Sequence, residues 1–164
     1  MKKHLIVGVV GGVLLTALAN AQMGMGNGMM GGMGGHRMMG HGADGVSVLR
    51  HRYVRINGIP QQYAKSRNPL TANDGNLAAG KTLFETNCAT CHGATGRGDG
   101  PAAQGLVPAP ANLTALTKTR VASDAYLDWT ISEGGVPVQS AMPAYKATLS
   151  KDDIWMLMLY LRTL

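Results

Sequence analysis

The sequence Cys88-Ala89-Thr90-Cys91-His92 is the most informative part of this 164-residue chain. Its C-x-x-C-H spacing is typical of covalent haem attachment. Two thiols on one helical turn can reach the two vinyl groups on one edge of a haem, and the adjacent imidazole then points at the iron. The motif therefore predicts one haem c, bound through thioethers to Cys88 and Cys91, with His92 as an axial ligand of the iron.

Two other kinds of site also use a cysteine pair at this spacing. A redox dithiol requires a strand-to-helix context, which the flanking sequence lacks. A structural zinc site requires four ligands, whereas Cys88 and Cys91 are the only two cysteines of the chain. Haem attachment is therefore the stronger interpretation.

The N-terminal residues have the order of a secretory signal peptide. Lys2-Lys3-His4 precedes an apolar run from Leu5 to Leu18, and Ala19-Asn20-Ala21 follows it. The apolar run is shorter than the ~20 residues that span a bilayer. We expect cleavage after Ala21 and export to the periplasm, where haem attachment in bacteria is completed.

Residues 22–43 are almost entirely Gly, Met and His. This composition predicts a disordered tail, because it cannot offset the entropy lost on ordering. Thioether and imidazole groups are also soft ligands that could chelate Cu(I). A spacer and a Cu(I) site both stay open as interpretations of the tail. The seven methionines and two histidines are Met23, Met25, Met29, Met30, Met33, Met38, Met39, His36 and His41.

Charge is distributed unevenly along the chain. Residues 80–164 carry seven Lys or Arg against seven Asp or Glu, whereas residues 44–79 carry five against two. Such a basic segment could steer an acidic partner or contact anionic lipid, or it could simply be a solvated surface. The export signal argues against nucleic acid as a partner.

Three helices are predicted after residue 75. The first runs from about Asn76 to Cys88, with apolar or small residues at helical spacing. The second begins after Ser123, a good N-cap, and ends before Gly134-Gly135. The third begins after Ser150, and Ile154, Leu157, Met158 and Leu161 then recur on one face.

With these motifs, the stretch from Gly80 to Leu164 resembles a class I cytochrome c, a small all-helical electron carrier. The resemblance implies that the first and last helices cross beside the haem. Gly80 and Phe84 match the first helix of that family, and Leu157 and Tyr160 match the last. We therefore expect an all-α haem domain over residues 76–164, preceded by a basic extension over residues 44–75.

The resemblance also implies two further site residues. Met142, in the loop Ala141-Met142-Pro143, matches the methionine that supplies the second axial ligand, so His92 and Met142 would both bind the iron. Gly98-Asp99-Gly100-Pro101 resembles the turn whose proline carbonyl accepts a hydrogen bond from the ligating imidazole, which would make Pro101 the partner of His92. Among the other histidines, His51 is the one serious competitor for Met142.

The upstream segment from Val46 to Leu70 is harder to interpret. Alternation in Tyr53, Val54, Ile56 and Ile59 predicts an extended strand that closes in the turn Asn57-Gly58. A single hairpin is marginal alone. We expect this segment to pack across the haem domain.

The resemblance implies an electron-transfer protein rather than an enzyme, with redox partners docking at the exposed haem edge, and the signal peptide predicts that it works in the periplasm. One alternative is a haem c subunit of a larger oxidoreductase, such as a dehydrogenase or a copper-containing reductase or oxidase. Another is a peroxidase-type haem enzyme. The latter needs an open iron position or a second haem, and neither is favoured by one C-x-x-C-H motif with Met142 available.

Overall fold

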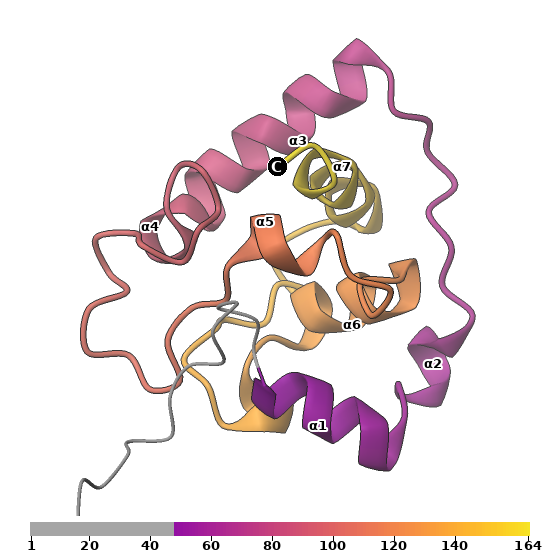
Figure 1. The fold of residues 1–164 in the computed structure, drawn as a ribbon. Coiled ribbons are helices and arrows are strands. Elements are labelled where there is room, and N and C mark those ends of the chain that lie inside the picture. Colours follow the sequence, from indigo (N-terminus) through magenta and orange to yellow (C-terminus); the bar gives the residue numbers. More distant parts are fainter. Residues whose placement is uncertain (1–47) are drawn as a thin grey trace, which may run out of the picture. The chain divides into compact units, whose positions relative to one another are not determined.

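The computed structural model describes residues 48–164, and this part of the chain consists of helices and loops (Figure 1). The predicted all-helical fold is therefore confirmed. The helices are α1 (Val48–Asn57), α2 (Gln61–Ala64), α3 (Asp74–Asn87), α4 (Ala89–His92), α5 (Leu113–Leu116), α6 (Asp124–Glu133), the 3-10 turn η1 (Val136–Val138) and α7 (Lys151–Leu161).

The predicted signal peptide and the Met- and His-rich tail lie outside the described residues. Cleavage after Ala21 and Cu(I) binding by the tail therefore stay predictions from sequence. Over residues 48–164, no helix combines the length and the apolar character needed to cross a membrane.

The three helices predicted from periodicity are confirmed, and their caps explain where they begin. The Ser123 side chain accepts a hydrogen bond from the Tyr126 N–H at the start of α6. Ser150 and Asp153 form a reciprocal capping box at the start of α7. Helix α3 begins slightly earlier than predicted, because the Asn73 side chain caps it by accepting from the Asn76 N–H.

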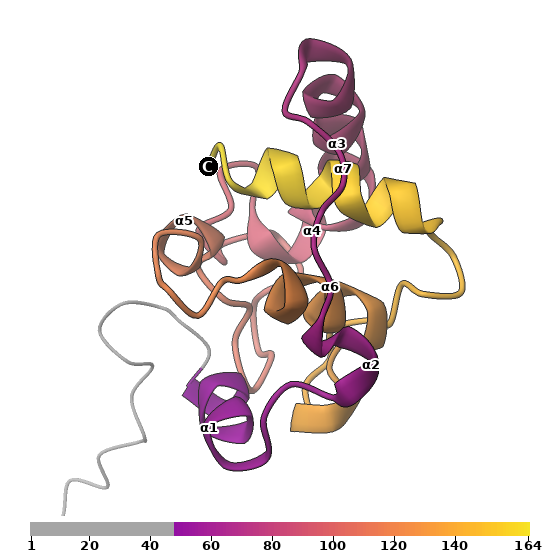
Figure 2. The same ribbon diagram turned by 90° about the vertical axis from the view of Figure 1, so that its right-hand side faces the viewer.

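Helices α3 and α7 cross each other and make the most extensive contact between two helices of the described chain (Figures 1 and 2). Gly80 lies at the crossing, where a Cβ atom would overlap the Met156 carbonyl and Tyr160 Cβ. One turn later the Phe84 and Tyr160 rings lie 5.5 Å apart. The small residue thus lets two backbones approach until their apolar faces interlock.

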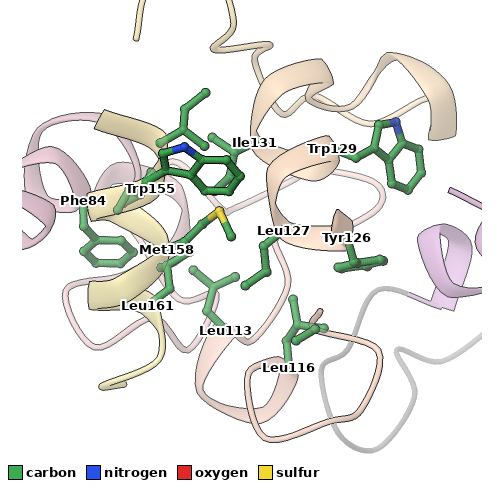
Figure 3. Close-up of a cluster of buried hydrophobic side chains, with 13 residues drawn as sticks. Phe84, Leu113, Leu116, Tyr126, Leu127, Trp129, Ile131, Trp155, Met158 and Leu161 are labelled. Atoms are coloured by element: carbon green, nitrogen blue, oxygen red, sulfur yellow. The ribbon is translucent and has the colours of Figure 1, made fainter. Parts of the chain in front are cut away.

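The hydrophobic core lies between α3, α5, α6 and α7, and most of its large side chains appear in Figure 3. Phe84 and Met158 are fully buried, and Trp129 and Leu157 are 1% exposed. Phe84 lies at the α3 end of this cluster, whereas Tyr126 and Trp129 project from α6 on the side of α1. The core therefore extends from the crossing of α3 and α7 to the N-terminal helix.

The predicted strand around Tyr53 is wrong, because residues 48–57 form helix α1. Arg50, Tyr53 and Val54 fall at helical spacing on one face of it. The Tyr53 ring stacks on Trp129 at a centroid distance of 5.4 Å. Gly58 follows the helix with φ of +74°, and its N–H donates to the Val54 carbonyl. The Asn-Gly pair thus ends a helix and does not close a hairpin.

Residues 63–68, which begin in α2 and continue past its end, run along helix α6 in the opposite direction and are held by three carboxylates of that helix. Tyr63 donates to Glu133 at 2.6 Å, Ser66 donates to Asp128 at 2.6 Å, and the Asn68 N–H donates to Asp124 at 2.9 Å. The carboxylates recur at about one helical turn, so each meets a donor from residues 63–68. Polar contacts therefore fix the register of this segment on α6.

Candidate haem site

Helix α4 places both cysteines of the motif on a single turn. The Cys88 carbonyl accepts hydrogen bonds from the N–H groups of Cys91 at 3.1 Å and His92 at 2.8 Å. Gly93, with φ of +78°, ends this turn directly after the histidine. Because the turn is so short, both thiols and the imidazole are held close together, as a covalently attached haem requires.

The His92 ring is oriented by a backbone carbonyl. Its Nδ1 lies 2.9 Å from the Ala111 oxygen. A carbonyl can only accept a hydrogen bond, so Nδ1 carries the proton and Nε2 keeps its lone pair for a metal. Burial holds the pKa of His92 below its usual range, although the bond to Ala111 opposes this shift. The imidazole is thus kept neutral and ready to ligate.

The prediction that Pro101 accepts this hydrogen bond is wrong. Pro101 is exposed, and Ala111 occupies the position expected for it. The glycines before Pro101 do contact the motif. The Gly98 N–H donates to the His92 carbonyl at 2.7 Å, and the Gly100 N–H to the Cys91 carbonyl at 3.2 Å. The loop therefore closes on the motif through its glycines, and the chain returns to His92 ten residues after Pro101.

The path of the chain after this loop explains why Ala111 faces the imidazole. Asn112 has an extended backbone conformation and caps α5 by accepting from the Ala115 N–H. The Leu113 N–H donates to the Gly96 carbonyl at 2.6 Å. These two contacts hold the Ala111 peptide against the motif. Nothing local in Pro110-Ala111-Asn112 indicates a contact with His92, so this partner came only from the folded chain.

Met142 lies in a loop that is fastened to α6 and to the end of α3. Its carbonyl accepts from the Gly135 N–H at 2.7 Å, and the Tyr145 N–H donates to the Ile131 carbonyl at 3.1 Å. The Tyr145 hydroxyl donates to the Asn87 carbonyl at 2.6 Å, directly before Cys88. Gly134 allows the close approach, since a Cβ there would overlap the Pro143 carbonyl. Tyr145 therefore supports this loop, a role that its place in the sequence did not indicate.

The motif and the Met142 loop line one cavity. Cys88, Cys91, His92 and Met142 all contribute to its surface. The rest of the wall is mainly apolar, and includes Leu106, Pro110, Leu113, Leu127, Ile131 and Leu157. The structure therefore brings together four of the five predicted site residues and leaves out Pro101. His51 does not line this cavity.

The residues of this cavity fit a covalent haem. Neither thiol forms a disulfide. Burial, and next the neighbouring Cys91, raise the pKa of the Cys88 thiol to about 12, so the sulfur stays protonated near neutral pH. The donor set thus consists of two thiols able to add to vinyl groups, one neutral imidazole and one thioether. The apolar walls match the faces of a porphyrin.

Comparison with known proteins gives the same assignment. A family model described as Cytochrome c matches residues 77–164, which is more than half of the chain. Cytochrome c-554(547) of Halothiobacillus neapolitanus is 36% identical over 94 residues, covering 55% of this chain and 98% of that protein.

Two further relatives are parts of larger assemblies. The cbb3-type cytochrome c oxidase subunit CcoP of Azospirillum sp. (strain B510) is 32% identical over 133 residues, covering 81% of this chain and 42% of that protein. This chain therefore spans less than half the length of that subunit. A solved structure, the reducing HAO-like protein complex of Kuenenia stuttgartiensis, has 27% identity and a TM-score of 0.48, covering 58% of this chain and 46% of that chain.

Proposed function

Since the chain belongs to the cytochrome c family and carries haem c, we propose that it is a periplasmic electron carrier with one haem. We further propose that His92 and Met142 occupy the two axial positions of the iron. The haem supplies a one-electron couple between ferrous and ferric iron. The protein holds this group in an apolar cavity, and its own residues undergo no chemistry in the transfer.

The observation that carries this proposal is the position of Met142. It lines the same cavity as His92, in a loop that hydrogen bonds fasten to α6 and to the end of α3. A thioether held in this way would favour the ferrous state and would leave no open position on the iron. A closed site supports electron transfer over catalysis, because a haem enzyme must bind its substrate at the metal.

The periplasmic location rests on the first 21 residues, which have the order of a secretory signal peptide. Periplasmic carriers dock their partners weakly and briefly. We place that docking at the exposed edge of the haem near Cys88 and Cys91. The electron donor and acceptor would be other redox proteins of the same compartment.

A second candidate function is that of a haem subunit within a larger oxidoreductase. The similarity to an oxidase subunit, CcoP, favours it. The haem site would be the same in both cases, so the distinction is one of assembly. Copurification of a larger complex from the native periplasm or membrane would identify a subunit, whereas a free monomer would identify a carrier.

The ligand assignment is tested with the variant Met142→Ala in the exported, haem-loaded protein. We expect the ferric wild type to show the long-wavelength band of a sulfur-to-iron bond, and the variant to lose it and to bind carbon monoxide. Met156→Leu is the matched control, because Met156 lies on α7 and does not line the cavity. Persistence of the band in Met142→Ala would reject Met142 as the ligand.

A further inference from the structure

Three buried polar atoms in residues 48–164 lack a hydrogen-bond partner, and they lie on α1 and α6 near Tyr126 and Trp129, with only Thr130 of the three residues lining the haem cavity. They are Arg50 Nη1, His51 Nε2 and Thr130 Oγ1. Thr130 and Tyr126, one turn apart on α6, both line the cavity. The His51 ring lies 5.9 Å from the Tyr126 ring. A cluster of unsatisfied groups at one place indicates a missing polar partner.

Arg50 is the member of this cluster whose burial costs the most free energy, because its side chain is charged. It is only 4% exposed, and its guanidinium lies 4.8 Å from the centre of the Trp129 ring. Nη2 donates to the Gly134 carbonyl. Within the described residues no carboxylate pairs with Arg50, since the ion pairs there involve other cations. A buried guanidinium without an anion is strongly unfavourable, so Arg50 requires a negatively charged partner.

The haem itself offers such a partner. A haem c is attached through its vinyl-derived edge, and its two propionates stand on the opposite edge. The attachment point is at Cys88, four residues after Phe84. In Figure 3, Tyr126 lies on the far side of the core from Phe84, toward α1. The unsatisfied groups therefore gather at the α1 end of the core, away from the cysteine end.

We propose that Arg50 forms an ion pair with a haem propionate, and that the Thr130 hydroxyl donates a hydrogen bond to the same propionate. The N-terminal extension then supplies a charge that neutralises a cofactor carboxylate. This inference rests on the proposed function only in that it requires haem in this cavity. It gives helix α1 a role in setting the reduction potential.

The geometry around Arg50 supports a positioning role. Tyr53, one turn further along α1, stacks on the Trp129 ring that also lies against the guanidinium. The Gly134 carbonyl fixes Nη2, which leaves Nη1 as the free donor. Gly135, the next residue, donates to the Met142 carbonyl. Arg50 is thus held by groups that also shape the α6 wall and the Met142 loop.

The test is the pH dependence of the reduction potential in haem-loaded Arg50→Gln. In the wild type the guanidinium keeps the propionate ionised, so the potential should not vary with this group between about pH 5 and 8. Without the cation, the buried propionate gains a raised pKa, and this pKa is higher in the ferrous than in the ferric protein. Reduction then takes up a proton, and the reduction equilibrium falls by up to about tenfold per pH unit as pH rises.

The other titratable groups of this wall do not produce the same signal. Burial raises the pKa of Tyr126 to about 12, so this hydroxyl stays neutral. Burial lowers the pKa of His51, and any His51 titration would be present in the wild type as well. The pH-dependent segment should therefore appear only when Arg50 loses its charge.

Arg52→Gln is the matched control, because it removes the same charge from an exposed position on α1. Its potential should follow the wild type at all pH values. Arg50→Lys keeps the charge and should restore most of the pH independence. Thr130→Val should also make the reduction potential depend on pH, but less strongly than Arg50→Gln does. Asp44→Asn, in the residues before the described range, should leave the potential unchanged.

Several outcomes would overturn the inference. If Arg50→Gln only lowered the stability and its potential followed Arg52→Gln, Arg50 would be a purely structural residue. If the pH-dependent segment of Arg50→Gln disappeared in the double variant Arg50→Gln/Asp44→Asn, the titrating carboxylate would be Asp44 and not a haem propionate. Failure of the proposed function would look different, because the wild type itself would then lack the haem or the sulfur-to-iron band.

Discussion

Asp128 has no exposed surface, yet it carries a carboxylate. It accepts hydrogen bonds from the Ser66 hydroxyl at 2.6 Å and the Ser132 hydroxyl at 3.1 Å, and it pairs with the Lys151 ammonium at 2.5 Å. Lys151 is half exposed, and its ammonium also lies over the Trp155 ring. The Asp128 side chain therefore joins the segment after α2, helix α6 and the start of α7.

Replacing Asp128 by Asn should lower the free energy of unfolding by roughly 2–4 kcal/mol, because the amide loses the charge that Lys151 and two hydroxyls stabilise. Denaturant unfolding followed by circular dichroism measures the change. Asp152→Asn, at an exposed position on α7, is the control and should change stability by about 0.5 kcal/mol or less. The visible spectrum should not change in either variant, since Asp128 does not line the haem cavity.

Equal losses in the two variants would contradict this account of Asp128. The buried carboxylate would then contribute no more than a surface charge.

Among the helices, the crossing of α3 and α7 depends on the absence of a side chain at Gly80. A Cβ there would come within 2.9 Å of Tyr160 Cβ and closer still to the Met156 carbonyl. Both neighbours belong to α7, and the carbonyl is backbone that cannot rotate away. Helix α7 would therefore have to move as a whole.

Gly80→Ala should destabilise the protein by roughly 1–3 kcal/mol through overpacking. Gly75→Ala is a matched control on the same helix, where the new Cβ would meet only Asn73 Oδ1 at an ordinary 3.5 Å. That control should gain up to about 1 kcal/mol, because alanine is the better helix former. Thermal unfolding of the haem-loaded variants measures both effects. A neutral Gly80→Ala would show that the crossing tolerates a wider separation.

The domain as a whole is built around a cavity that its own side chains do not fill. Helices α4, α5 and α6 and the Met142 loop contribute to its walls. A core that surrounds an apolar space loses contacts when nothing fills that space. The haem is therefore expected to act as part of the core.

The double variant Cys88→Ser/Cys91→Ser should be purified without covalent haem, and its mass should lack the tetrapyrrole increment. We expect a lower unfolding midpoint and weak near-ultraviolet circular dichroism, because the cavity walls lose their support. Cys91→Ser alone keeps one attachment point and should be intermediate. A haem-free double variant that unfolds with the cooperativity and midpoint of the wild type would contradict this view of the core.

Local signals in the chain predicted a large part of this structure. The C-x-x-C-H motif identified the haem site, because attachment chemistry depends on residues within one helical turn. Ser123 and Ser150 marked the starts of α6 and α7, because capping bonds span only three residues. Periodicity was less informative around Tyr53, where a short apolar run fits either a strand or a helix until its packing partner is known.

Contacts between distant residues came only from the folded chain. The His92 ring bonds to a carbonyl 19 residues away, and Arg50 bonds to one 84 residues away. Any residue type can offer a backbone carbonyl, so no side-chain pattern marks Ala111 or Gly134 as an acceptor. Which carbonyl is reached depends on the paths of the loops and on how α1 packs against α6, and these arise from the summed burial of many side chains.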